Sequence, residues 1–297
     1  MGLSKKKRIL IKQQYGTIST EELAKKLGLE EQEILQAAKE FGLESAGMGS
    51  SFEQSFFPYV KTFLVPLLVL TTLAFIIYAN ALDGDFIYDD EVIMETEAVH
   101  AHTLSQIPTV LFSDPSVSMD RKVGMLSFAV NYYFSRLNPY GYHLVNVIIH
   151  IVNGFLVYLL IRLTLRMPVI SGRVRERAEL TALAGAVLWV VHPVQTQAVT
   201  YIIQRFASMA ALFFLLALLF YVHGRMRKGW ICFVFYFAAL CCGLVALGTK
   251  QTAAILPVVI LLYEVFFLKG ITLGLNKKSI AAMAGVVMVM GVLSYVF

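Results

Sequence analysis

Charged side chains are scarce in this sequence. They make up only 15% of the 297 residues, whereas hydrophobic residues make up 58%, and the mean hydropathy is +0.68. An ordinary globular domain carries about 25% charged residues. This composition excludes a soluble domain and indicates an integral membrane protein.

Cysteine is also rare. The three cysteines all lie in one apolar run, residues 230–247. Their spacing fits neither a disulfide framework nor a zinc site. We interpret them as small packing residues of a membrane helix.

Long apolar runs dominate what remains. A helix needs roughly 20 apolar residues to cross a bilayer. These runs are too long and continuous for the strands of a barrel, so helices must satisfy their backbone groups. We therefore expect an all-α, polytopic membrane protein with about seven transmembrane helices. The runs cover 60–82, 143–165, 179–192, 205–222, 230–247, 252–268 and 279–297.

Lysine and arginine gather on alternate connections between these runs. Cytoplasmic loops carry such an excess, so the pattern places the N-terminus inside the cell. It places residues 83–142 outside, together with the turns at 192–204 and 248–251. The basic residues that set this orientation are Lys5, Lys6, Lys7, Arg8, Arg166, Arg173, Arg175, Arg177, Arg225, Arg227, Lys228, Lys269, Lys277 and Lys278.

The first 45 residues differ in character from the rest. Apolar positions recur there at helical spacing, with candidate core residues at Ile18, Leu23, Leu27, Ile34 and Leu35. We predict a cytoplasmic module like a helix-turn-helix over 1–45, broken at Gly28, and a flexible linker over 46–59. Acidic residues in its second helix would repel phosphate, which disfavours nucleic acid as a partner. A docking or regulatory role is favoured instead, with a membrane protein complex as the possible partner.

Two adjacent carboxylates, Asp89 and Asp90, follow the first run in an apolar setting. Such a pair can differ in pKa, so that one carboxylate serves as a general base. It can also hold a divalent cation, although nothing in the sequence requires a cofactor. The alternative is a solvated acidic turn at the start of a helix.

Arg121 opens a predicted helix over 121–136 that lies on the bilayer instead of crossing it. Its guanidinium is suited to forking onto phosphate oxygens. Snorkelling to the lipid headgroups is the equally open alternative.

Four polar residues share one face of the second run: His143, Asn146, His150 and Asn153. A stripe of this kind must face protein or water. His143 and Asn146 lie nearest the external surface and are candidates for substrate binding. Hydrogen bonding between helices is the structural alternative, and it suits His150 and Asn153 best.

The connection between the third and fourth runs begins at His192-Pro193, where proline bends or ends the helix. Gln197, Tyr201 and Arg205 then recur at every fourth position. Arg205 and, in a later turn, Lys250 are cations on the side that should be poor in them. We therefore predict that they bind an external anion. His192, Gln197 and Tyr201 complete the candidate substrate-binding set.

Several segments, in order and spacing, resemble the membrane half of the transmembrane and tetratricopeptide-repeat O-mannosyltransferases and their bacterial relatives, in the GT-C superfamily. The segments are Phe86-Ile-Tyr-Asp-Asp-Glu, Arg121 with Leu126-Ser-Phe-Ala-Val-Asn, Tyr142-His-Leu-Val-Asn-Val-Ile-Ile-His, His192-Pro-Val-Gln-Thr-Gln-Ala-Val-Thr-Tyr-Ile-Ile-Gln-Arg, and Thr249-Lys-Gln-Thr-Ala-Ala-Ile-Leu-Pro. The similarity covers about 60–270.

The resemblance implies a GT-C-like fold and a polyprenyl-phosphate sugar as the donor. Asp89 would be the base with Asp90 as its neighbour, while Arg205, Lys250 and Arg121 would bind the lipid phosphate. It further implies an extracytoplasmic site, membrane lipids as partners, and location in a bacterial inner membrane.

The sequence departs from the family pattern at several points. Lys122 and Val123 stand where the family commonly has Pro-Leu, and Gln197 and Gln251 stand where relatives often carry Glu. No tetratricopeptide repeats follow, and the sequence stops inside an apolar run. A fragment, a split protein or a shortened relative would each account for this. The alternative function is therefore a catalytically inactive relative that serves as an accessory subunit of a membrane complex.

Overall fold

The computed structural model describes residues 7, 9–11, 20–41, 60–108, 118–119 and 121–268. The chain divides into two compact units, Met1–Leu64 and Val65–Phe297, and each is described by itself. The predicted linker over 46–59 and the seventh apolar run over 279–297 lie outside the described residues.

The first unit contains helices α2 (Thr20–Leu27) and α3 (Glu31–Glu40). Gly28 lies between them with φ of +60°, a conformation that glycine adopts without strain. Leu23, Leu27 and Ile34 are buried as predicted, but Leu35 is 45% exposed. The role of this unit in docking stays a prediction.

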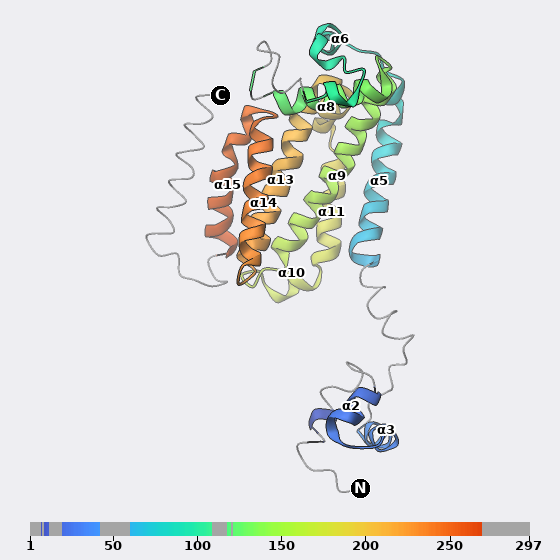
Figure 1. The fold of residues 1–297 in the computed structure, drawn as a ribbon, viewed down its shortest axis with the longest axis vertical. Coiled ribbons are helices and arrows are strands. Elements are labelled where there is room, and N and C mark those ends of the chain that lie inside the picture. Colours follow the sequence, from blue (N-terminus) through green and yellow to red (C-terminus); the bar gives the residue numbers. More distant parts are fainter. Residues whose placement is uncertain are drawn as a thin grey trace. The chain divides into compact units, whose positions relative to one another are not determined.

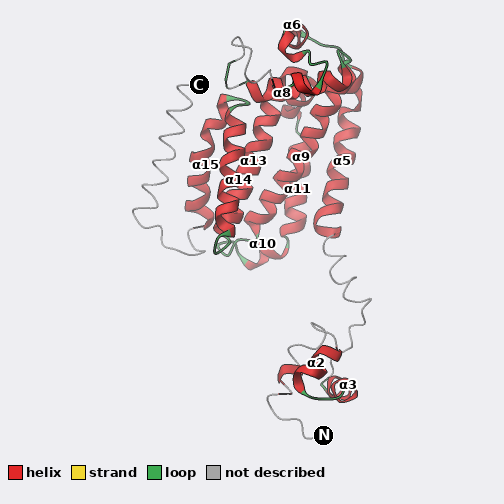
Figure 2. Ribbon diagram, viewed as in Figure 1, coloured by secondary structure: helices red, strands yellow, loops and turns green. Residues whose placement is uncertain are grey.

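The second unit is a bundle of helices, and Figure 2 shows no strand among the residues it describes. Six of the predicted apolar runs form helices in it, as Figure 1 shows. These are α5 (Val65–Tyr78), α9 (Pro139–Leu165), α11 (Ala178–Val191), α13 (Arg205–Arg225), α14 (Ile231–Leu247) and α15 (Leu256–Tyr263).

Within the described part of the chain, four helical stretches are long and apolar enough to cross a membrane. A fifth span results if Ala178–Val191 and Pro193–Thr200, which meet at a bend of 51°, are counted as one. The helix over Ile231–Leu247 is shorter. The protein is thus an all-helical membrane protein, whereas the count of about seven spans is not confirmed. The four stretches are Thr62–Asp83, Pro139–Leu165, Ile202–Arg225 and Gln251–Leu268.

Small residues bring α11 against its neighbours. Ala178, Ala182 and Ala186 recur every fourth residue and are buried. Such a stripe lets helix backbones approach closely in a membrane, where packing and not hydrophobicity drives association. Ala182 and Ala186 pack in one cluster with Leu70 of α5 and Val147 of α9.

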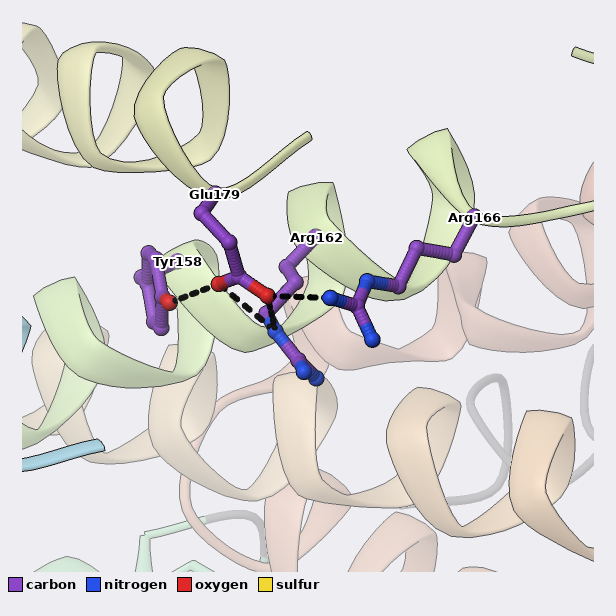
Figure 3. A network of polar contacts seen from close by, with 4 residues as sticks. All are labelled: Tyr158, Arg162, Arg166 and Glu179. Atoms are coloured by element: carbon purple, nitrogen blue, oxygen red, sulfur yellow. Dashed lines mark hydrogen bonds and ion pairs between the residues drawn. The ribbon is translucent and has the colours of Figure 1, made fainter. Parts of the chain in front are cut away.

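Ionic networks close the end of the bundle that carries α10 (Gly172–Glu176). There the Glu179 carboxylate accepts hydrogen bonds from the Tyr158 hydroxyl at 2.6 Å, Arg162 Nε at 2.8 Å and Arg166 Nη2 at 2.5 Å (Figure 3). Glu264 is paired with Arg225.

The opposite end of the bundle carries short helices and connections. Figure 1 shows α6 (Glu91–Glu95) and α8 (Lys122–Ser135) there, with α8 lying across the helix ends. The helix predicted at the bilayer surface corresponds to α8, and its Phe128 and Ala129 are buried in the protein core. The other elements at this end are η2 (Ala79–Asp83), η3 (Tyr88–Asp90), η4 (Glu97–Val99), η5 (Leu104–Gln106), η6 (Pro193–Gln195), α12 (Thr196–Thr200), η7 (Ile202–Gln204) and η8 (Gln251–Ile255).

Candidate active site

A cavity of about 750 Å³ opens at the end of the bundle that carries α6 and α8. We call it the charged cavity, because Asp89, Arg121 and Lys250 all line it. These residues come from three separate segments, and the sequence predicted that they would meet. The cavity is also lined by Val92, Thr96, Ser118, Met125, Ile203, Gln204, Phe206, Thr249, Gln251 and Thr252.

The two adjacent aspartates take different environments. The short helix η3 leaves Asp89 exposed in the charged cavity, while Asp90 is fully buried. The Asp90 carboxylate accepts hydrogen bonds from the N–H groups of Ile203 at 2.7 Å and Ile87 at 3.1 Å. Asp90 therefore fixes the loop, and Asp89 is the carboxylate that faces the cavity.

Burial is the largest influence on the Asp90 carboxyl and raises its pKa above the usual value. The two backbone N–H groups act in the opposite direction, because they stabilise the ionised form.

The possible divalent cation at Asp89 and Asp90 stays a prediction. Both Asp90 oxygens are engaged with backbone N–H groups, so the pair does not present two open carboxylates to a metal ion. In the part of the chain that the structure describes, no group of three or more His, Cys, Asp or Glu residues is placed to hold a metal.

The two cations are held on one rim of the charged cavity. Arg121 precedes α8, and Lys250 precedes η8. The backbone N–H of Val123 donates to the Gly248 carbonyl at 3.0 Å and ties these two segments together. The Arg121 guanidinium also lies 5.8 Å from the centre of the Phe206 ring. The backbone hydrogen bond thus holds in place the two segments from which Arg121 and Lys250 line the cavity.

Arg205 does not line this cavity, in contrast to its predicted contact with lipid phosphate. It is fully buried at the start of α13. Its Nε donates to Asn146 Oδ1 at 2.7 Å, and its Nη2 donates to Asn131 Oδ1 at 2.8 Å. The guanidinium also lies 4.5 Å from the centre of the Phe128 ring. Arg205 points into the core and there joins α8, α9 and α13.

Asn146, like Arg205, is buried and makes hydrogen bonds within the protein core. Besides accepting from Arg205, its amide lies 3.3 Å from the Ile202 carbonyl and 3.4 Å from the Val199 carbonyl, to which it donates. It thereby holds the segment that leads into α13. His143 is buried beside Gly84, at which an added Cβ would lie 3.0 Å from the ring.

The deeper members of the polar stripe bond between helices, as the structural alternative predicted. His150 Nε2 lies 3.0 Å from the Val190 carbonyl, and the Asn153 amide donates to the Ser208 carbonyl at 2.8 Å.

The remaining candidates do not line the charged cavity. A second cavity of about 660 Å³ is lined by Tyr88, Gln197 and Tyr201, among others. The Tyr201 hydroxyl accepts a hydrogen bond from the Asp89 backbone N–H at 2.9 Å and so connects the two regions. His192 is exposed, and its Nδ1 accepts from the Val194 N–H at 3.2 Å.

Sequence reasoning missed several residues of the charged cavity. Ser118, Gln204 and Thr252 supply polar groups there, and Phe206 supplies an apolar wall. They are uncharged, so nothing in the positive-inside pattern distinguishes them. Gln204 and Phe206 are adjacent in sequence to Arg205, and Thr252 is two positions after Lys250, so these three could have been found from the predicted cations.

The sequence is similar to several curated proteins. Protein O-mannosyl-transferase TMTC2 of Homo sapiens is 31% identical over 215 residues, which cover 68% of this chain and 24% of that protein. The resemblance inferred from the motifs is confirmed. Tmtc1 of Drosophila melanogaster is 30% identical over 191 residues, 62% of this chain and 21% of that protein. Protein O-mannosyl-transferase TMTC4 of Homo sapiens is 32% identical over 167 residues, which cover 52% of this chain and 22% of that protein.

The chain thus spans about a quarter or less of the length of these relatives. They are animal proteins, so the bacterial inner membrane stays a prediction. No family model matches the chain, and no solved structure matches it.

Proposed function

We propose that this chain is a glycosyltransferase that moves a sugar from a polyprenyl-phosphate donor to an acceptor hydroxyl outside the cytoplasm. The observation that carries the proposal is the presence of Asp89, Arg121 and Lys250 in one cavity. The names of the similar proteins favour mannose as the sugar and a protein as the acceptor.

Asp89 serves as the general base. Its carboxylate takes the proton from the acceptor hydroxyl while the acceptor oxygen forms a bond to the anomeric carbon of the sugar. The bond from that carbon to the phosphate oxygen breaks, and the polyprenyl phosphate leaves with the electron pair. A base positioned in this way contributes about 10²- to 10⁴-fold to a rate.

Arg121 and Lys250 stabilise the leaving group. Negative charge develops on the phosphate oxygen as the bond to the sugar breaks, and cations fixed beforehand lower the barrier at that point. A guanidinium can grip two phosphate oxygens at once, whereas an ammonium acts as a compact charge. The pairing of Val123 with Gly248 holds both groups for this task.

The distribution of charge supports an extracytoplasmic site. The basic connection around α10 lies at the end of the bundle opposite α6 and α8 (Figure 1). By the positive-inside rule that basic end faces the cytoplasm, and the charged cavity faces the other compartment.

The test is sugar transfer by the purified protein in lipid vesicles, with radiolabelled mannosyl polyprenyl phosphate and a peptide rich in serine and threonine. We expect the wild type to label the peptide and Asp89→Asn to lose at least about 100-fold in kcat. Asp85→Asn is the matched control, because Asp85 is an exposed carboxylate of the same loop outside the cavity. Equal turnover by Asp89→Asn and wild type would remove Asp89 as the base.

The same assay distinguishes the accessory-subunit alternative. Gln251, which stands where relatives often carry Glu, lines the charged cavity and is the observation that favours it. A wild-type protein that binds no lipid-linked sugar, transfers none and co-purifies in fixed stoichiometry with a larger membrane complex would establish that alternative.

A further inference from the structure

The imidazole of His143 is buried near the start of α9, and it takes no part in the proposed proton transfer. Only 3% of the residue is exposed. Neither Nδ1 nor Nε2 has a hydrogen-bond partner among the residues that the structure describes. A buried polar group without a partner lowers stability, so native proteins keep few of them. One that persists points to a functional contact.

The His143 ring lies against the loop that carries the proposed base. We call residues 84–90 the aspartate loop. Gly84 opens it, and a Cβ added there would lie 3.0 Å from Nε2 and 3.5 Å from Cε1 of the ring. At the other end of the loop, burial raises the pKa of Asp90, and the His143 imidazole is among the groups that lower it. One ring thus lies near both ends of the aspartate loop.

The far end of the aspartate loop is cross-linked to the segment before α13. Asp90 accepts from the Ile203 N–H at 2.7 Å, and the Asp89 N–H donates to the Tyr201 hydroxyl at 2.9 Å. The near end is held differently. The Gly84 N–H donates to the Ala81 carbonyl at 3.1 Å, which ties Gly84 to its own turn and not to α9.

The Gly84 carbonyl is the acceptor that the His143 ring can reach. The N–H of Gly84 is already used, and its backbone lies close enough to influence the ring without meeting hydrogen-bond geometry. Hydrogen bonds of an active site often shorten when substrate binds. Because Asp89 lines the charged cavity, a donor in that cavity contacts the same loop.

We propose that His143 is a positioning residue whose Nε2–H bonds to the Gly84 carbonyl when the donor binds, and that this bond sets the aspartate loop for proton transfer. The inference rests on the proposed function for its donor and its reaction. Without the bond, Asp89 keeps its carboxylate but loses its fixed position.

Replacing the imidazole separates a positioning role from a structural one. His143→Leu removes an unsatisfied group, so without donor it should unfold at a temperature equal to or above that of the wild type. Its kcat for sugar transfer should nevertheless fall by at least about tenfold, since a small misplacement of a reacting group is costly. His143→Gln, whose amide can reach the position of Nε2, should restore most of the wild-type kcat.

His150→Leu is the matched control on the same face of α9. His150 Nε2 lies 3.0 Å from the Val190 carbonyl, so this substitution removes a hydrogen bond that the structure contains. Its unfolding temperature should therefore fall below that of the wild type.

Gly84→Ala probes the same contact from the loop. The φ of Gly84 is −73°, which alanine also adopts, so the substitution acts through the added Cβ, which crowds Nε2 of His143. It should lower kcat by at least about tenfold. Gly172→Ala is the control, because a Cβ there meets open space.

Donor binding supplies a readout that needs no transfer. Mannosyl polyprenyl phosphate should raise the unfolding temperature of the wild type in nanodiscs, because it binds the folded state. Its Kd for His143→Leu should be at least about tenfold weaker than for the wild type, since the variant cannot form the added hydrogen bond.

A His143→Leu protein that unfolds below the wild type, as His150→Leu should, would show that the imidazole already has a partner and would overturn the inference. Unchanged kcat and donor Kd in His143→Leu, beside a wild type that transfers sugar, would also overturn it and leave the proposed function intact. A wild type that neither binds nor transfers the donor would remove the proposed function and the role of His143 with it.

Discussion

The Tyr201 hydroxyl accepts a hydrogen bond from the Asp89 backbone N–H at 2.9 Å. This contact joins the loop after α5 to the segment before α13, 112 positions away in sequence. The bond between Asp90 and the Ile203 N–H lies beside it. These two hydrogen bonds therefore hold the short segment that carries Asp89, the proposed base.

Tyr201→Phe should reduce kcat for sugar transfer by about 10- to 100-fold, since small displacements of a reacting group are costly. The KM for the donor should stay within about twofold, because the cations that bind it are unchanged. Tyr88→Phe is the control, as the Tyr88 side chain is 82% exposed. A rise in KM with unchanged kcat would assign Tyr201 to substrate binding instead.

Arg205→Lys should unfold the bundle at a lower temperature. The lysine cannot serve Asn131, Asn146 and the Tyr142 carbonyl together, and each lost hydrogen bond to the buried charge is worth about 1.5–3 kcal/mol. Thermal unfolding in detergent measures this loss. Arg121→Lys, at an exposed position, should leave the unfolding temperature unchanged. A stable Arg205→Lys protein with a raised KM would mean that Arg205 contacts the donor.

Fixed cations should govern donor affinity. Arg121→Ala and Lys250→Ala should each raise the KM for the polyprenyl-phosphate donor by about tenfold, and added salt should weaken the wild type more than either variant. Steady-state kinetics at two ionic strengths measures both effects. Lys228→Ala is the control, because Lys228 is exposed near the basic end of the bundle. If none of these variants changes the KM for the donor, the donor phosphate does not bind in this cavity.

Asp90 should make stability depend on pH. Its pKa is raised by burial, so the folded state binds the proton more tightly than the unfolded state does. Its contribution is then fully present below the ordinary aspartate pKa of about 4 and is lost as pH rises through the raised value.

The unfolding temperature of the wild type, relative to Asp90→Asn, should accordingly be higher near that acidic limit than at neutral pH. Asp85→Asn, which changes an exposed carboxylate of the same loop, is the matched control. The opposite result would be an unfolding temperature of the wild type that rises relative to that of Asp90→Asn as pH increases. It would show that the backbone N–H groups affect the Asp90 pKa more than burial does.

The sequence predicted the meeting of Asp89 with Lys250 but not the position of Arg205. Arg205 and Lys250 both depart from the positive-inside pattern, but that pattern reports only on which side of the membrane basic residues gather. It cannot tell a cavity from a core. Arg205 is satisfied by amides of Asn131 and Asn146, whose closeness depends on how α8 crosses the bundle.

The bend at His192-Pro193 was predictable, because proline acts on its own backbone.

A double-mutant cycle between Asp89 and Lys250 tests most directly whether the charged cavity is one catalytic site. The quantity measured is kcat/KM for sugar transfer by the wild type, Asp89→Asn, Lys250→Gln and the double variant. Groups that act on one transition state give strongly non-additive losses. We predict that the double variant is hardly slower than Asp89→Asn alone. Losses that multiply independently, or unchanged transfer in either single variant, would contradict the account.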